Sequence, residues 1–201
     1  MQQLPYARPE LLEAYPGRGI TEEQKASVDD FTVEVEEILT DPALVIYGLA
    51  RSVSAAFSNV FARVEAAIGE EQALAIAEDF GRTHGTANYR RFLENRNLAG
   101  GPRAMCEYQD WAHALRGPRQ ATALFASFDD TSVVVERTDC VYYFGERGAG
   151  NKYVEAIERG MMKGYTDVDP TLSHVENDRC LCKGSAEGCR HRFVFRSPPA
   201  D

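Results

Sequence analysis

The fold class is decided by the C-terminal segment of residues 171–196, which reads TLSHVENDRCLCKGSAEGCRHRFVFR. Residues 171–182 and 189–196 each have the composition and alternation of a β-strand. The loop between them, Lys183–Gly188, contains two glycines, which favours a hairpin. Phe193 and Phe195 mark the face of the second strand that should point into a core. The sequence therefore predicts an antiparallel hairpin with one buried face.

A second hairpin is predicted upstream of the first. Residues 121–128 are strand-like, Asp129-Asp130 is typical of a turn, and residues 132–137 form a β-branched run. Residues 151–165 then return to a helical pattern. The pattern therefore predicts a helix that separates two hairpins.

The N-terminal half of the chain has a helical pattern. Thr21 and Gln24 form a capping-box signature at the start of the first helix. The predicted helices cover residues 21–39, 42–69, 70–95 and 103–115. A core face in the second helix is predicted from residues at helical spacing: Leu49, Val53, Phe57, Val60, Val64 and Ile68.

The third helix carries two neighbouring ridges. The apolar stripe that is expected to face the core consists of Ala73, Ala77, Phe80, His84 and Ala87. The ridge beside it is small at every fourth position, through Ala77, Gly81 and Gly85. Because glycine costs about 1 kcal/mol in a helix, this ridge indicates the close approach of another helix or of a ligand.

Helices first and strands afterwards indicate an α+β fold. We expect an N-terminal helical layer packed on a four-stranded antiparallel sheet, with a helix between the two hairpins. Residues 1–20 should form an irregular arm and residues 197–201 a tail. A single domain is expected over residues 21–196, helical over 21–117 and sheet-rich over 118–196.

Composition and charge restrict the class of protein. The 201 residues suit one domain, and 44% hydrophobic with 26% charged residues excludes a wholly disordered chain. No apolar run approaches the ~20 residues of a membrane span, and no signal-peptide stretch opens the chain, so a cytoplasmic location is expected. The net charge of −9 argues against nucleic acid or an anionic membrane as partner. An acidic surface and an exposed helix over residues 21–39 would suit a homodimer.

The cysteines allow two interpretations of the C-terminal hairpin. The five cysteines are an odd number in a chain expected to be cytoplasmic, which makes a poor disulfide framework. If Cys182 pairs with Cys189, then Cys180 lies opposite His191, and these four residues share one face. Three thiolates and an imidazole suit zinc. The alternative is that the cysteines are buried and pack as small hydrophobic residues.

Cys140 is a candidate nucleophile. It follows the predicted strand 132–137 and is expected at the start of a helix, where a thiolate is stabilised, with Arg137 adding positive charge. His174 first, or His84 second, would move protons, and Asp167 or Asp169 of the Asp-Val-Asp-Pro turn would orient the base, with Asp169 preferred. The alternative for Cys140 is a packed cysteine at the boundary of an element. Tyr142 and Tyr143 would line a pocket or belong to the core.

Residues 133–195 are similar to the C-terminal half of the L-2-amino-thiazoline-4-carboxylate hydrolase-like family. The matching pieces are the segment Glu136–Tyr143 (ERTDCVYY), an acidic turn near Asp169, and a hairpin with a glycine and cysteines before Phe193. This resemblance implies a hydrolase that opens a C–N bond in a cyclic amidine, amide or similar heterocycle, with Cys140 as nucleophile and no cofactor. Thr166 stands where the family has the cysteine of its Cys-x-x-Asp turn.

The closing hairpin also resembles the 4-vinyl-reductase domain, which ends in a similar motif of a glycine followed by a cysteine. This second resemblance implies a small-molecule-binding or sensor domain, in which the cysteine–histidine face holds zinc or simply packs. The enzyme hypothesis assigns catalysis to Cys140, His174 and Asp169. It assigns substrate binding to His84, Arg137, Tyr142 and Tyr143.

Overall fold

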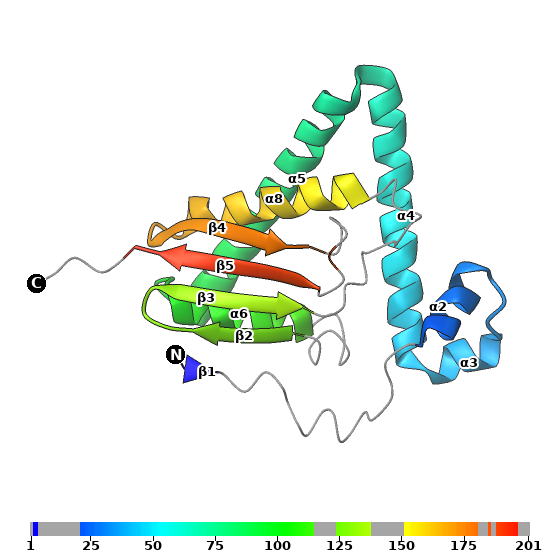
Figure 1. The fold of residues 1–201 in the computed structure, drawn as a ribbon, viewed down its shortest axis with the longest axis horizontal. Coiled ribbons are helices and arrows are strands. Elements are labelled where there is room, and N and C mark those ends of the chain that lie inside the picture. Colours follow the sequence, from blue (N-terminus) through cyan, green and yellow to red (C-terminus); the bar gives the residue numbers. More distant parts are fainter. Residues whose placement is uncertain are drawn as a thin grey trace, which may run out of the picture.

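In a computed structural model of the chain, the described residues are 2–3, 21–114, 124–137, 151–180, 185 and 188–196. They form an α+β fold with helices first and most of the sheet afterwards (Figure 1). The helices are α2 (Glu22–Asp29), α3 (Val35–Thr40), α4 (Pro42–Ile68), α5 (Glu70–Arg96), α6 (Pro102–Ala114) and α8 (Asn151–Val168). The strands are β1 (Gln2–Gln3), β2 (Leu124–Phe128), β3 (Ser132–Arg137), β4 (Leu172–Arg179) and β5 (Cys189–Phe195).

The sheet is antiparallel throughout and has the strand order β1-β2-β3-β5-β4. The two predicted hairpins are β2–β3 and β4–β5, and α8 lies between them in the chain. The predicted count of four strands is wrong because Gln2–Gln3 pairs with β2 as a fifth strand at the edge. The rest of the predicted arm and the tail 197–201 lie outside the described residues.

Two β-bulges change the register of the C-terminal hairpin from the one considered above. They interrupt β4 between Leu172 and His174 and between Asn177 and Arg179. Each bulge places two residues of β4 against one of β5 and so inverts the alternation of faces. Asn177, and not Cys180, therefore lies opposite His191.

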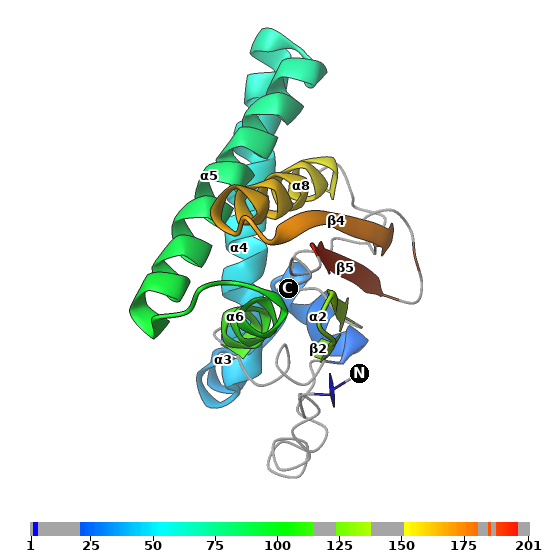
Figure 2. The same ribbon diagram turned by 90° about the vertical axis from the view of Figure 1, so that its left-hand side faces the viewer.

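The helices that cover the sheet are α6 and α8. The first packs on β2 and β3, and the second packs on β4. Figure 2 shows both on one side of the strands, with α5 beyond α8. The expectation that the N-terminal helices alone cover the sheet is therefore wrong. One of the two covering helices, α8, follows β3 in the chain, and α5 packs chiefly on α8.

Glycines set the contact between α5 and α8. A Cβ on Gly81 would clash with the backbone of Ile157, and a Cβ on Gly160 would clash with the backbone of Glu78. A Cβ on Gly85 would come within 2.6 Å of the Met161 carbonyl oxygen. The small ridge of α5 therefore faces another helix and not a ligand.

The buried face of α5 differs from the predicted stripe. Ala73 and Ala77 are buried as expected, but the buried face continues through Gly81 and Gly85. Phe80 and His84 are exposed. The close helix crossing turns the glycine ridge inward, and the larger side chains of the stripe then point away from α8.

The predicted core face of α4 is also wrong. Leu49 is 62% exposed and Val53 is 49% exposed, and only Val64 of the predicted set is half-buried. The helix itself has the predicted bounds, but it stands beside the sheet and its helices (Figure 1). Periodicity correctly predicted an apolar face, and in the structure this face is not covered.

The first predicted helix, 21–39, is divided into α2 and α3. Thr21 forms the predicted capping box with Gln24. The helix ends because Phe31 adopts a left-handed backbone, with φ of 58°. The break lets Val28 and Val33 pack on Leu44 and Tyr47 of α4.

Candidate functional site

Two cysteines meet at the loop end of the β4–β5 hairpin. Cys180 follows β4 directly, Cys189 begins β5, and both side chains are buried. Their Sγ atoms are 3.8 Å apart, far beyond the ~2.05 Å of a disulfide, so the two are not bonded to each other. The amide of Ser185 donates a hydrogen bond of 3.1 Å to the carbonyl oxygen of Cys180.

The spacing of these thiols fits metal coordination. Two thiolates on one tetrahedral zinc, each at about 2.3 Å, have sulfurs about 3.8 Å apart. Cys180 also lies just beyond the last residue of β4 and not within the strand. Within the part of the chain that the structure describes, no three histidine, cysteine or acidic side chains are grouped closely enough to hold a metal. The described residues could therefore offer two sulfurs to a metal, and Cys182 lies outside them.

A buried histidine–carboxylate pair shares the inner face of β5 with Cys189. His191 is 1% exposed, and its Nε2 is 3.6 Å from Oε1 of Glu158 on α8. The side chain of Glu158 is mostly covered. The separation is longer than a hydrogen bond, so Glu158 acts on the imidazole through its negative charge. Glu158 carries no motif in the sequence, and only the packing of α8 on the sheet identifies it.

Asp169 has a different environment from the predicted one. Its carboxylate is fully buried and accepts four hydrogen bonds. The donors are the Tyr89 hydroxyl (3.1 Å), the Gly101 amide (2.8 Å), and the Thr171 amide (3.0 Å) and hydroxyl (2.6 Å). The Asp169 carboxylate thus links α5, the α5–α6 loop and the residue before β4. These contacts are those of a structural carboxylate.

The surroundings of Asp169 leave little room. Burial, and after it the Asp169 carboxylate, raises the pKa of Tyr89, so this phenol stays a neutral donor. Gly100 has a φ of +94°, and a Cβ there would come within 2.7 Å of the carboxylate. The loop between α5 and α6 therefore closes directly over Asp169.

The predicted histidines do not join a common site. His174, expected on the core face, has a side chain that is 53% exposed because the first bulge of β4 turns it to solvent. It contacts Ser173 and Glu176 at the surface. His84 is exposed on α5 and hydrogen-bonds to Asn88.

The remaining predicted site residues are only partly described. The backbone of Arg137 ends β3 opposite Cys189, and its side chain is outside the described part. Cys140, Tyr142 and Tyr143 also lie outside the described residues. Cys106, the remaining cysteine, is buried in α6 within the main core.

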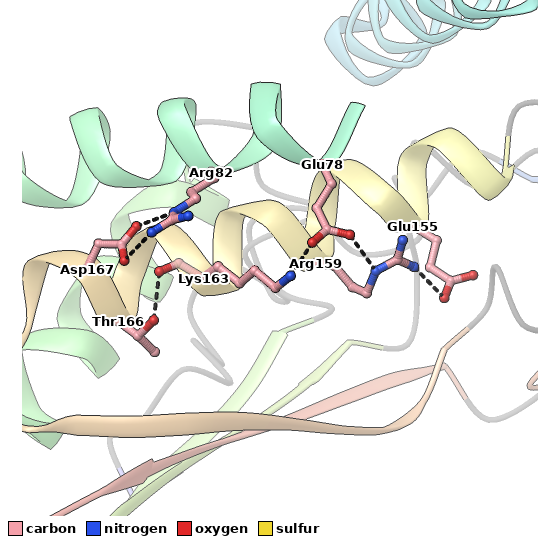
Figure 3. A network of polar contacts seen from close by, with 7 residues as sticks. All are labelled: Glu78, Arg82, Glu155, Arg159, Lys163, Thr166 and Asp167. Atoms are coloured by element: carbon pink, nitrogen blue, oxygen red, sulfur yellow. Dashed lines mark hydrogen bonds and ion pairs between the residues drawn. The ribbon is translucent and has the colours of Figure 1, made fainter. Parts of the chain in front are cut away.

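Ion pairs line the exposed edge of the α5–α8 contact (Figure 3). Glu78 of α5 binds both Lys163 and Arg159 (3.1 Å) of α8, and one turn further Arg82 holds Asp167 through two hydrogen bonds. The hydrogen bond from Lys163 is the main reason that the pKa of Glu78 is lowered. The hydrogen bond from Arg82 lowers the pKa of Asp167 in the same way. These pairs fix the two helices against each other.

Thr166, at the position of the family's cysteine, also belongs to the network of Figure 3. Its hydroxyl donates a hydrogen bond of 2.7 Å to the Lys163 carbonyl oxygen inside α8. The Thr166 side chain therefore bonds to its own helix, three residues before Asp169.

No family model, curated protein or solved structure matches the chain. Among the described helices, none combines the length and the apolar character that crossing a bilayer requires. The two family resemblances therefore stay predictions, and function is inferred from the positions of the cysteines and of His191.

Proposed function

We propose that the protein is a small-molecule-binding or sensor domain of the 4-vinyl-reductase type, in which the loop end of the β4–β5 hairpin is held by zinc. The observation that carries the proposal is the buried Cys180–Cys189 pair, with its Sγ–Sγ distance of 3.8 Å. Zinc would hold the ends of the two strands together across the connecting loop and so fix the sheet.

The proposed ligands are the sulfurs of Cys180, Cys189 and Cys182, the last of which lies outside the described residues. Cys182 is two residues from Cys180 in the chain, which limits the distance between their Cα atoms to about 7 Å. His191 also lies on the inner face of β5, but no three histidine, cysteine or acidic side chains among the described residues are close enough to hold one metal, so His191 is not among the proposed ligands. Thiolate ligands must stay reduced, which agrees with the proposed cytoplasmic location.

Metal analysis tests this proposal. The protein, purified without a histidine tag, is expected to contain one equivalent of zinc, and Cys189→Ser is expected to lose it. Cys106→Ser is the matched control, since Cys106 lies in the core around α6 and should leave the zinc in place. A wild-type protein that stays zinc-free after growth with added zinc contradicts the proposal, as does zinc loss in Cys106→Ser.

A hydrolase that opens C–N bonds is the second candidate, and the buried His191–Glu158 pair favours it. A buried imidazole beside a carboxylate is suited to proton transfer, which His174 at the surface is not. In this candidate Cys140 attacks the electrophilic carbon, and His191 takes the role first assigned to His174. Asp169 is not needed, because its carboxylate is fully occupied by four donors.

Thiol reactivity separates the two candidates. The hydrolase predicts a metal-free protein with one thiol that iodoacetamide alkylates rapidly near pH 7, and Cys140→Ala should abolish this reaction. If the thiolates bind zinc, alkylation should be slow and should become fast only after a chelator removes the metal. Mass spectrometry of a small molecule carried through purification would identify the ligand in either case.

A further inference from the structure

An apolar face remains exposed along α4 and the neighbouring part of α5. Large apolar side chains point to solvent at successive turns of α4, and two more continue the face on α5. The set, called the α4 face below, consists of Val45, Leu49, Val53, Phe57, Val60, Ile68, Ile76 and Phe80. The rings of Phe57 and Phe80 are 5.5 Å apart, so the two helices contribute to one continuous surface.

Among the described residues, few pack on the middle of α4. Near its C-terminal end Phe61 packs with Ala73, Ala77 and Tyr153, and near its N-terminal end Leu44 and Tyr47 pack on residues beside α2. Between these two contacts the helix stands apart from the sheet and its covering helices (Figure 1). Since most helix stability in proteins comes from packing of an apolar face, a 27-residue helix in this position needs a further surface.

The size of the α4 face suits a dimer. The exposed fractions of its eight side chains correspond to about 600 Å² of apolar surface, against about 800 Å² per partner in a standard interface. The small residues between them would add to this area. Exposed apolar patches of this extent on a single protomer are typical of interaction sites.

The charge pattern favours a second copy as the partner. Although the chain has a net charge of −9, the 27 residues of α4 contain only three charges, at Arg51, Arg63 and Glu65. A twofold contact brings groups near the axis close to their own copies, so a self-associating face is favoured when it is nearly neutral there. A face that attracts a charged partner would instead carry complementary charges.

We propose that the α4 face is the interface on which a second copy of this chain docks, giving a twofold homodimer. The helices α4 of the two protomers pack against each other, with Val53 and Phe57 near the centre and Phe80 at the margin. This proposal is independent of the zinc site, which lies at the loop end of the β4–β5 hairpin.

Sedimentation velocity and light scattering of the full chain over about 1–100 μM test the proposal. The wild type is expected at twice the 22.3 kDa chain mass over most of this range. Val53→Glu places a charge at the centre of both halves of the interface. It should raise the dimer dissociation constant on the order of 100-fold or more, because each dimer carries the change twice.

Ala55→Glu is the matched control, since Ala55 is exposed on the opposite side of α4. It adds the same charge two residues away and should leave the dimer intact. Circular dichroism should show both variants folded, because both positions are exposed in the protomer. Val60→Ser, a milder change on the same face, should weaken the dimer without adding charge.

Three results overturn the proposal. The first is a wild type that stays monomeric at 100 μM, whether residues 4–20 of the chain or a different molecule covers the face. The second is a dimer that Val53→Glu does not weaken. The third is equal weakening by Val53→Glu and Ala55→Glu, which would place the contact elsewhere.

Discussion

Replacing Asp169 with asparagine is expected to lower the stability of the protein by about 3 kcal/mol. The side chain keeps its size, so the change acts on hydrogen bonding and charge alone. In the wild type, one carboxylate oxygen accepts from Tyr89 and Gly101, and the other accepts both hydrogen bonds from Thr171. All four donors therefore depend on a group that is completely buried.

The magnitude follows from which donors can adapt. The amide nitrogen of asparagine must replace one of the two oxygens, and each oxygen accepts from one backbone N–H and one hydroxyl. A hydroxyl can rotate and accept, but the backbone N–H of Gly101 or Thr171 cannot. One buried amide then loses its partner at a cost of about 1–3 kcal/mol, and the other bonds lose their charge assistance.

Thermal unfolding followed by circular dichroism measures the effect. For a chain of this size, about 3 kcal/mol corresponds to a Tm lowered by roughly 6–12 °C. Asp167→Asn, two residues away, is the matched control because it removes only an exposed ion pair with Arg82, and its Tm should stay within about 3 °C of the wild type. If Asp169→Asn melts within about 2 °C of the wild type, the structural role of Asp169 is refuted.

Two further predictions concern the contact between α5 and α8. Gly81→Ala should lower the free energy of unfolding by about 1–3 kcal/mol in a denaturant titration, because the added Cβ meets the Ile157 backbone. The control Gly48→Ala has open space around the new Cβ and should raise the free energy of unfolding by up to about 1 kcal/mol. Equal effects of the two changes would contradict the close crossing of α5 and α8. The pKa of Asp167 is lowered in the folded state, so its pairing with Arg82 stabilises the protein fully above the ordinary value of 3.8 and is lost as the pH falls through the lowered value. The stability difference between wild type and Asp167→Asn should therefore be constant near neutral pH and disappear in acid, and a difference that grows on acidification would be inconsistent with the ion pair.

Local sequence rules predicted the elements well because the relevant residues act within one turn. Thr21 and Gln24 form the expected capping box, and the helix ending before Gly69 and the strand 132–137 have the predicted bounds. The glycine ridge through Gly81 and Gly85 also indicated a close contact, since glycine in a helix is costly without one. The sequence left open whether a helix or a ligand made this contact.

The errors have a common physical origin in tertiary structure. Strict alternation along β4 placed His174 inside, but a bulge adds one residue without a clear mark in the sequence. The periodicity of α4 shows an apolar face, but it does not say whether that face is covered within the protomer or by another molecule. The pairing of Cys180 with Cys189 depends on the second bulge, so it could not be derived from the spacing of the cysteines.

The zinc site is the claim on which the proposed function depends, and X-ray absorption at the zinc edge of the untagged wild-type protein tests it most directly. We predict two or more sulfur neighbours at about 2.3 Å from the metal, and in Cys180→Ser either fewer sulfur neighbours or loss of the zinc. A zinc environment of nitrogen and oxygen alone would show that the metal is bound elsewhere. It would leave Cys180 and Cys189 as packed thiols and contradict the account.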